Sequence, residues 1–323
     1  MKELLRELCG IPGPSGNEDC IREAIRKAVE GMADDLRTDA LGNLILRKGS
    51  GDRKLMLAAH MDEIGLIVTH VEENGFLRFG TIGGIAPVAL VGQRVQFLDG
   101  SLGVIGCEKV DDRKDLKQEH LFIDVRNGSN RRVGDVCCPV GGAEFDGDFV
   151  VSRALDDRVG CVVLIETLRR LCAEGFQGAE VYFVFTVQEE LGLRGAHTAT
   201  FGVKPDVGIA VDVTVAGDTP KAKSTSLRLG KGCAIKVKDH SVITTPAVRR
   251  KLQKIAEERG IPYQLEVLEQ GGTDAGAIQL TCGGIPTGAV SVPVRYVHTP
   301  SETAHMGDVE ACVNLLVQFI KEA

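Results

Sequence analysis

Apolar residues recur along the chain with two different periods. A helical period of three to four residues appears near the N-terminus, where Ser15 and Glu18 also have the spacing of a capping box. Thr245 followed by Pro246 is typical of a helix start, with proline at the first helical position. The helices that these patterns predict span residues 21–32, 157–173, 246–259 and 308 to the C-terminus.

Continuous apolar runs form the second pattern. Such runs predict strands that are buried on both faces, as in a parallel sheet covered by helices. They lie at residues 55–60, 181–187, 207–213 and 287–293. We therefore expect an α/β fold with a mixed, mostly parallel sheet flanked by helices.

Residues 66–148 have a different character from the rest of the chain. Short β-type runs are separated by glycine and charged residues, and no helical period is clear. This pattern predicts a small all-β domain inserted into the α/β fold. The catalytic domain is then discontinuous, comprising residues 1–65 and 149–323.

Composition and charge exclude several classes of protein. The chain has 323 residues, a formal net charge of −7 and no basic run, so nucleic acid is not an expected partner. It has no apolar window of membrane-spanning length and no signal-peptide pattern, so we expect a cytoplasmic protein with no membrane partner. Ten cysteines are present without a CxxC pair, which argues against a cysteine zinc site.

Several of the predicted buried strands end in acidic residues or histidine. Because ligands of open α/β sheets bind beyond the carboxyl ends of the strands, these side chains can converge on one crevice. The candidate set is His60, Asp62, Asp156, Asp157, Glu189, Glu190, Asp212 and His298. Most of these residues alone are more often structural, and the pair Asp156 and Asp157 is equally well explained as a helix N-terminus. Four core strands that all end in metal-binding groups, however, are not expected from packing. Two histidines with several carboxylates suit zinc or cobalt, and manganese less well.

Eight motifs in a constant order make the chain resemble the tetrahedral (TET-type) metallo-aminopeptidases. This is the glutamyl, leucyl and deblocking aminopeptidase group, formerly also labelled endoglucanases. The motifs are GIPGPSGNE, DALGNL, AAHMDEIGLIV, ALDDRVG, QEELGLRGA, VDVT, GGTDAGAI and VPVRYVH. They extend over nearly the whole chain, which makes the resemblance specific.

The resemblance implies a zinc-peptidase-like α/β fold and a dinuclear metal centre that hydrolyses N-terminal residues from peptides. It implies that Asp156 bridges two divalent ions, that His60 and Asp212 complete one site, and that Glu190 and His298 complete the other. It also implies that Glu189 is the general base for a metal-bridged water and that Asp62 orients His60. The inserted domain is then a PDZ-like oligomerisation domain, and the usual assembly is a homo-oligomer of twelve subunits.

One segment departs from the family pattern, and a second has two possible interpretations. The stretch VRNGSNRRVGD, which begins at Val125, is short where the family has a helix-forming segment, so a dimer is an alternative to the dodecamer. The glycine-rich GGTDAGAI segment either lines the substrate pocket through Asp274 or is a tight turn into a packed helix. We expect Arg295 to form a salt bridge with a core carboxylate and His305 to be structural.

Three other functions compete with an aminopeptidase. The nearest is a related two-metal carboxypeptidase or N-acyl amino-acid deacylase, and the discriminator is whether the substrate needs a free amine end or a free carboxylate end. A glycosidase with two carboxylates needs no histidine-rich metal cluster, so loss of activity on chelation would exclude it. A metal-loaded binding or scaffold protein is the non-enzymatic alternative, and turnover of aminoacyl substrates separates it from the others.

Overall fold

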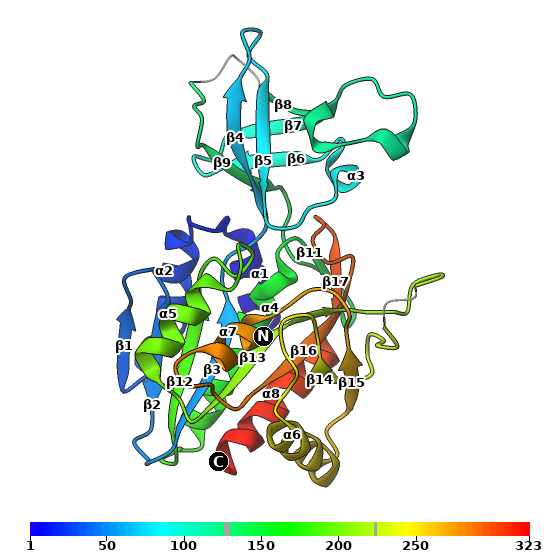
Figure 1. Cartoon of the computed structure of the whole chain (residues 1–323). Coiled ribbons are helices and arrows are strands. Elements are labelled where there is room, and N and C mark those ends of the chain that lie inside the picture. The colour runs from blue at the N-terminus through cyan, green and yellow to red at the C-terminus, as the bar shows by residue number, and fades with distance from the viewer. Residues whose placement is uncertain (126–129, 223–224) are drawn as a thin grey trace.

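The computed structural model describes residues 1–125, 130–222 and 225–323, which form a large α/β body and a smaller β-barrel (Figure 1). The helices are α1 (Lys2–Gly10), α2 (Asp19–Ala28), α3 (Pro87–Leu90), α4 (Leu155–Ala173), α5 (Arg194–Val203), α6 (Pro246–Arg259), α7 (Asp274–Leu280) and α8 (Met306–Lys321). The strands before α4 are β1 (Asp35–Thr38), β2 (Leu44–Lys48), β3 (Lys54–His60), β4 (Gly65–Val71), β5 (Leu77–Ile82), β6 (Arg94–Phe97), β7 (Leu102–Cys107), β8 (Leu121–Val125), β9 (Val136–Pro139), β10 (Glu144–Asp146) and β11 (Phe149–Ser152). The later strands are β12 (Glu180–Thr186), β13 (Val207–Val215), β14 (Cys233–Lys238), β15 (Tyr263–Val267), β16 (Thr287–Arg295) and β17 (Glu302–His305).

The large sheet is parallel at its centre and antiparallel toward both ends of its strand order, and the attached pair β14–β15 is also parallel. Its strand order is β1-β2-β12-β3-β13-β16-β17-β11-β10, with β14 and β15 attached beside β16. The pairs β12–β3, β3–β13 and β13–β16 are parallel, whereas β1–β2, β2–β12, β16–β17 and the pairs beyond them are antiparallel. The expected mixed α/β sheet is confirmed.

The central strands are buried on both faces, which explains their continuous apolar sequences. In β3, Leu55 and Leu57 pack into the core beneath α4 and α8, while Met56 packs on the opposite face against α5 and α7. Alternate residues of a strand point to opposite faces, so a strand covered on both sides must be apolar at every position. Helices α1, α2, α4, α6 and α8 cover one face of the sheet, and α5 and α7 cover the other (Figure 1).

The smaller body is a closed barrel with the strand order β4-β5-β8-β7-β6-β9. Its own apolar core contains Leu66, Phe79, Val95, Phe97 and Ile123, among others. One short helix, α3, and two 3₁₀ turns interrupt the strands, so the segment is not wholly β. In Figure 1 the barrel stands away from the large body and is connected to it through the chain before β4 and after β9.

The barrel strands run from residue 65 to residue 139, whereas the sequence led us to expect an insert over 66–148. Strand β10 accounts for most of the difference, because it pairs with β11 in the large sheet, and β11 pairs with β17. Residues 126–129, which lie in the shortened segment after Val125, are outside the described residues.

The capping box expected from Ser15 and Glu18 is wrong. Helix α2 begins only at Asp19. Glu18, which precedes it as the N-cap residue, makes no side-chain capping bond. Glu18 instead accepts hydrogen bonds from the backbone N–H groups of Gly16 and Gln188, and Ser15 donates to Asp62. The side chains that local spacing assigned to a helix cap therefore form hydrogen bonds with the segments after β3 and β12 instead. Within the described residues, every helix is too short or too polar to cross a lipid bilayer.

Candidate metal centre

A cavity of about 620 Å³ opens at the carboxyl ends of the central strands. Strands β3 and β13 are paired only as far as Ala58 and Ala210, so they diverge just before His60 and Asp212. This divergence opens the crevice at which open α/β sheets bind their ligands. The candidate residues that line the cavity are His60, Asp156, Glu189, Glu190, Asp212 and His298.

The carboxylate of Asp156 lies between two histidines. Its Oδ1 is 2.9 Å from Nε2 of His60, and its Oδ2 is 3.2 Å from Nε2 of His298. Nε2 of His60 is also 3.8 Å from Oδ1 of Asp212, and Nε2 of His298 is 3.1 Å from Oε1 of Glu190. Each oxygen of Asp156 thus faces a separate pair made of one histidine and one carboxylate.

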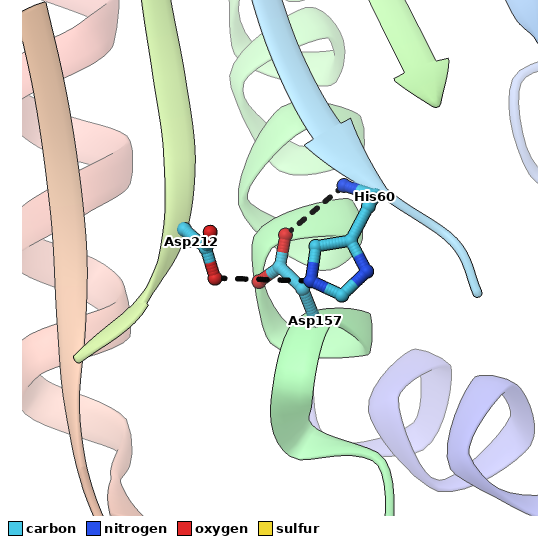
Figure 2. A group of neighbouring side chains, drawn as sticks. All are labelled: His60, Asp157 and Asp212. Atoms are coloured by element: carbon cyan, nitrogen blue, oxygen red, sulfur yellow. Dashed lines mark hydrogen bonds and ion pairs between the residues drawn. The ribbon is translucent and has the colours of Figure 1, made fainter. Parts of the chain in front are cut away.

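Asp157 lies beside this cluster and anchors the end of β3. Its Oδ2 accepts a hydrogen bond from the backbone N–H of His60 at 3.2 Å, and its Oδ1 accepts one from Gly160 at 2.9 Å. Gly160 has to be glycine for this approach, since a Cβ there would come within 2.3 Å of the carboxylate. His60, Asp157 and Asp212 point toward one another from β3, α4 and β13 (Figure 2). Within the described residues they form one of two groups whose ligand atoms are close enough to hold a metal ion. The second group is His60, Asp156 and Glu190.

Asp62 connects His60 with the segment that carries the two glutamates. Its Oδ1 lies 3.4 Å from Nδ1 of His60 and accepts a hydrogen bond from the backbone N–H of Glu189 at 3.0 Å. Its Oδ2 accepts from the hydroxyl of Ser15 at 2.6 Å and from the N–H of Glu190 at 3.3 Å. Asp62 is fully buried, so this carboxylate holds the imidazole and the glutamate backbone in one fixed arrangement.

The charges of the cluster favour a bound cation. Burial raises the pKa of Glu189 and of Asp212 well above their usual values, and neighbouring carboxylates add to both shifts. Burial opposes the charged form of His60 as well, but hydrogen bonds to Asp156 and Asp62 raise its pKa well above the usual range. Carboxylates outnumber the histidines, and buried charge of one sign is costly unless it is paired or coordinates a metal. Oε1 of Glu190 is buried without a hydrogen bond, with Nε2 of His298 3.1 Å away. This donor set fits hard or borderline divalent ions.

Comparison with known proteins identifies the family. The family model of the M42 glutamyl aminopeptidases matches residues 42–315, which is most of the chain. The chain belongs to the M42 aminopeptidase family. M42 membership makes the chain a peptide-bond hydrolase and implies divalent metal ions as cofactors.

Individual relatives match the M42 chain over almost its full length. A protein of Acetivibrio thermocellus, provisionally named an aminopeptidase, is 50% identical over 99% of this chain and 98% of its own. The structure of the aminopeptidase APDkam598 from the archaeon Desulfurococcus kamchatkensis superposes with a TM-score of 0.94 at 39% identity, covering 100% of this chain and 94% of that one. The TET1 peptidase of Pyrococcus horikoshii has a TM-score of 0.89 at 36% identity, with 98% of both chains covered. That peptidase can assemble into a tetrahedron or a large octahedral shell.

Two functional contacts of this M42 chain were not foreseen from its sequence. Glu302 is buried, and its two oxygens accept hydrogen bonds from the backbone N–H groups of Asp156 at 3.0 Å and His298 at 2.8 Å. The carbonyl oxygen of Gly84, from the chain after β5, lies 2.7 Å from Nδ1 of His298. Glu302 lies four residues after His298 in a turn sequence, without a strand-end pattern, so no sequence signal distinguished it. Gly84 acts through its backbone, which sequence composition does not reveal.

Three further residues that the sequence singled out lie outside the cavity lining of the M42 chain. Asp274 is buried, accepts a hydrogen bond from Thr186 at 2.6 Å, and is not among the cavity-lining residues, whereas Gly271 and Gly272 are. Arg295 forms the expected salt bridge, but its partner is Asp218 in the chain after β13 rather than a core residue. His305 caps α8 by accepting from the N–H of Gly307, so its structural role is confirmed.

Proposed function

We propose that this M42 enzyme removes N-terminal residues from peptides with a dinuclear centre in the cavity between β3 and β13. In this assignment Asp156 bridges two divalent ions, His60 and Asp212 complete one site, and Glu190 and His298 complete the other. Glu189 is the general base. Asp62 and Glu302 position these groups without binding metal themselves.

The position of Asp156 carries the proposal. A bridging ligand has to present its two oxygens to two sites about 3.5–4 Å apart. The oxygens of Asp156 face Nε2 of His60 at 2.9 Å and Nε2 of His298 at 3.2 Å, and each histidine has a second carboxylate beside it. Asp157 is a weaker candidate for a ligand, because backbone N–H groups already engage both of its oxygens.

The reaction then follows from the positions of the protein groups. Divalent ions, when bound, supply Lewis acidity that makes a water nucleophilic at neutral pH and polarises the scissile carbonyl. Glu189 lines the cavity and is not engaged as a ligand in this assignment, so it accepts the proton of the attacking water and passes it to the leaving amine. Asp62 fixes the tautomer of His60 through Nδ1, and the carbonyl of Gly84 does the same for His298.

The donor set also limits the metal. Each proposed site combines one histidine nitrogen with carboxylate oxygens, a combination typical of zinc and of cobalt, with manganese as a further option. Calcium and magnesium prefer all-oxygen surroundings, so the histidines argue against them.

We propose further that the barrel, residues 65–139, serves assembly of the enzyme into homo-oligomers. The α/β body has its own sheet and core without it. Apolar side chains are exposed on the barrel, including Leu102 and Val104 on alternate positions of β7, which are 53% and 43% exposed. A further similar structure, that of PhTET1-12s, is described as a dodecamer, which supports a dodecamer here, and a dimer is the alternative.

The roles of the adjacent glutamates can be separated by substitution. Glu189→Gln removes the base and leaves the proposed ligands intact, so the variant should retain two metal ions per chain while kcat falls about 10²–10⁴-fold. Glu190→Gln replaces a carboxylate ligand with a neutral amide, so metal content should fall together with activity. Elemental analysis and turnover of aminoacyl p-nitroanilides, with zinc, cobalt or manganese added, measure both effects.

Glu30→Gln is the matched control, because Glu30 is exposed and lies far along the chain from the site residues. It should leave metal content and turnover unchanged. If Glu189→Gln loses metal while Glu190→Gln retains it, the two roles are reversed. A ratio of one ion per chain at saturating metal contradicts the dinuclear centre, and faster cleavage of N-acylated than of free-amine substrates would favour a deacylase.

A further inference from the structure

The walls of the cavity beyond the proposed metal cluster are apolar. Four partly exposed side chains form them: Leu193 before α5, Val215 at the end of β13, Leu268 after β15 and Val297 after β16. Gly271 and Gly272 contribute backbone without side chains. Apolar side chains that stay partly exposed around a concave site are typical of a surface that binds an apolar ligand group.

Charged groups in the cavity lining all belong to the proposed metal cluster and its base. The remaining described lining residues with polar side chains are Thr214 and Gln270, and both are uncharged. The hydroxyl of Thr214 already donates to Glu266 at 2.5 Å. Gln270 is exposed.

Charged side chains behind these walls are already paired. Arg295 holds Asp218 with two hydrogen bonds of 2.7 Å, and Lys236 donates to Glu266 at 2.6 Å while lying 3.4 Å from Asp239. Lys236, Glu266 and Asp239 are all buried. Outside the proposed metal cluster and its base, the described lining therefore offers no charged partner to a charged side chain of a substrate, and burial of an unpaired charge is unfavourable.

We propose that this enzyme selects peptides with an apolar N-terminal side chain, such as leucine, methionine or phenylalanine, and discriminates against N-terminal glutamate and lysine. Leu193, Val215, Leu268 and Val297 are the specificity-determining wall. The inference rests on the proposed function, because the metal cluster fixes where the first residue of the peptide lies. A preference for apolar side chains would also separate this chain from the glutamyl aminopeptidases after which its family is named.

The test compares kcat/KM for leucyl, methionyl, phenylalanyl, glutamyl and lysyl p-nitroanilides on the metal-loaded wild-type enzyme. The apolar substrates should exceed the glutamyl and lysyl ones by at least about 10-fold, within the range of discrimination that apolar pockets provide. Equal or higher kcat/KM for the glutamyl or lysyl substrate overturns the proposal. This comparison decides the question without any substitution, so it does not depend on the folding of a variant.

Substitution of one wall residue then locates the selectivity. Leu268→Arg should raise the ratio of glutamyl to leucyl kcat/KM at least about 10-fold, because it places an unpaired cation in the wall. Val267→Arg is the matched control: Val267 precedes Leu268, is 55% exposed and does not line the cavity, so the ratio should stay as in the wild type. An unchanged ratio in both variants removes Leu268 from the wall and contradicts the proposed arrangement.

Binding separates failure of this inference from failure of the proposed function. Leucine, glutamate and lysine hydroxamates are titrated calorimetrically into the zinc-loaded protein, with no turnover needed. If every aminoacyl substrate resists cleavage, the proposed function is wrong, yet tighter binding of leucine hydroxamate would still support the apolar pocket. Equal or tighter binding of the glutamate or lysine compound overturns the inference whatever the activity.

Discussion

Two buried carboxylates in this enzyme hold the proposed ligands by accepting hydrogen bonds from the backbone N–H groups of those ligands. Glu302 accepts the N–H groups of both Asp156 and His298, and Asp157 accepts the N–H of His60. His298 has a positive φ of 62°, in the left-handed region that disfavours residues with a side chain. The bond from its N–H to Glu302 helps to hold that conformation, so the buried carboxylate acts on two ligands that lie far apart in the sequence.

We expect Glu302→Gln to weaken metal binding. The amide retains one acceptor oxygen but places an NH₂ group against the second backbone N–H, so one of the two ligands loses its support. Loss of such outer contacts typically costs about 10–100-fold in metal affinity or activity. Competition with a chromophoric chelator measures the metal dissociation constant, and kcat/KM is measured in parallel.

Glu310→Gln serves as the comparison, since Glu310 on α8 is partly exposed and forms a salt bridge with Arg170 on α4. Its metal affinity should equal that of the wild type. Unchanged affinity and unchanged kcat/KM in Glu302→Gln would show that the two backbone contacts do not position the ligands.

At the scale of elements, strand β14 carries a buried ionic group beneath the cavity wall. Lys236 on β14 lies 2.6 Å from Glu266 on β15 and 3.4 Å from Asp239, and all three are at most 1% exposed. Burial would lower the pKa of Lys236, but the two carboxylates raise it, so the lysine stays charged. Because β15 leads directly into Leu268, this group fixes the strand from which the proposed specificity wall begins.

Lys236→Met should destabilise the fold strongly. Removing one member of a buried ionic group leaves the others uncompensated and typically costs about 3–5 kcal/mol. The free energy of unfolding in urea should therefore fall by about that amount. Lys254→Met is the control, because Lys254 forms an exposed pair with Glu258 and exposed pairs contribute at most about 1 kcal/mol. Equal losses in both variants would contradict a special role of the buried group.

At the scale of the whole molecule, the barrel and the α/β body meet at the proposed metal centre. The carbonyl of Gly84, in the segment after β5, lies against His298, so the arrangement of the two bodies affects the orientation of a proposed ligand. An assembly that fixes the position of each barrel would therefore also restrict the orientation of His298 in the proposed metal centre.

We expect the enzyme to be a homo-oligomer held together through the barrel. Size-exclusion chromatography with light scattering should give a mass that is a multiple of 34.6 kDa, about twelve-fold for the proposed dodecamer. Leu102→Lys places a charge on the exposed apolar face of the barrel and should lower this mass. Leu280→Lys, at a 75% exposed apolar position of α7 in the large body, should not. A monomeric wild type at micromolar concentration contradicts the proposal.

The local pattern of the chain was sufficient to determine the central elements. The apolar runs at 55–60, 181–187, 207–213 and 287–293 are β3, β12, β13 and β16, because strands covered on both faces must be apolar throughout. The helices over 157–173 and 246–259 follow from their period in the same way. Strand-end acids and histidines were a sufficient signal to find the cluster, since parallel strands bring their carboxyl ends to one edge.

Only the tertiary structure decided which distant groups support that cluster. Ser15 has the spacing of a helix cap, yet it donates to Asp62, and Glu302 opens the short edge strand β17, yet it accepts a hydrogen bond from the N–H of Asp156. Strand β10 follows the barrel in sequence, yet it belongs to the large sheet through β11. The physical reason is common to all three: buried polar groups must find hydrogen-bond partners, and long-range packing determines which partner is near. The apolar wall of the cavity has the same origin, since its four side chains come from four segments that only the folded sheet brings together.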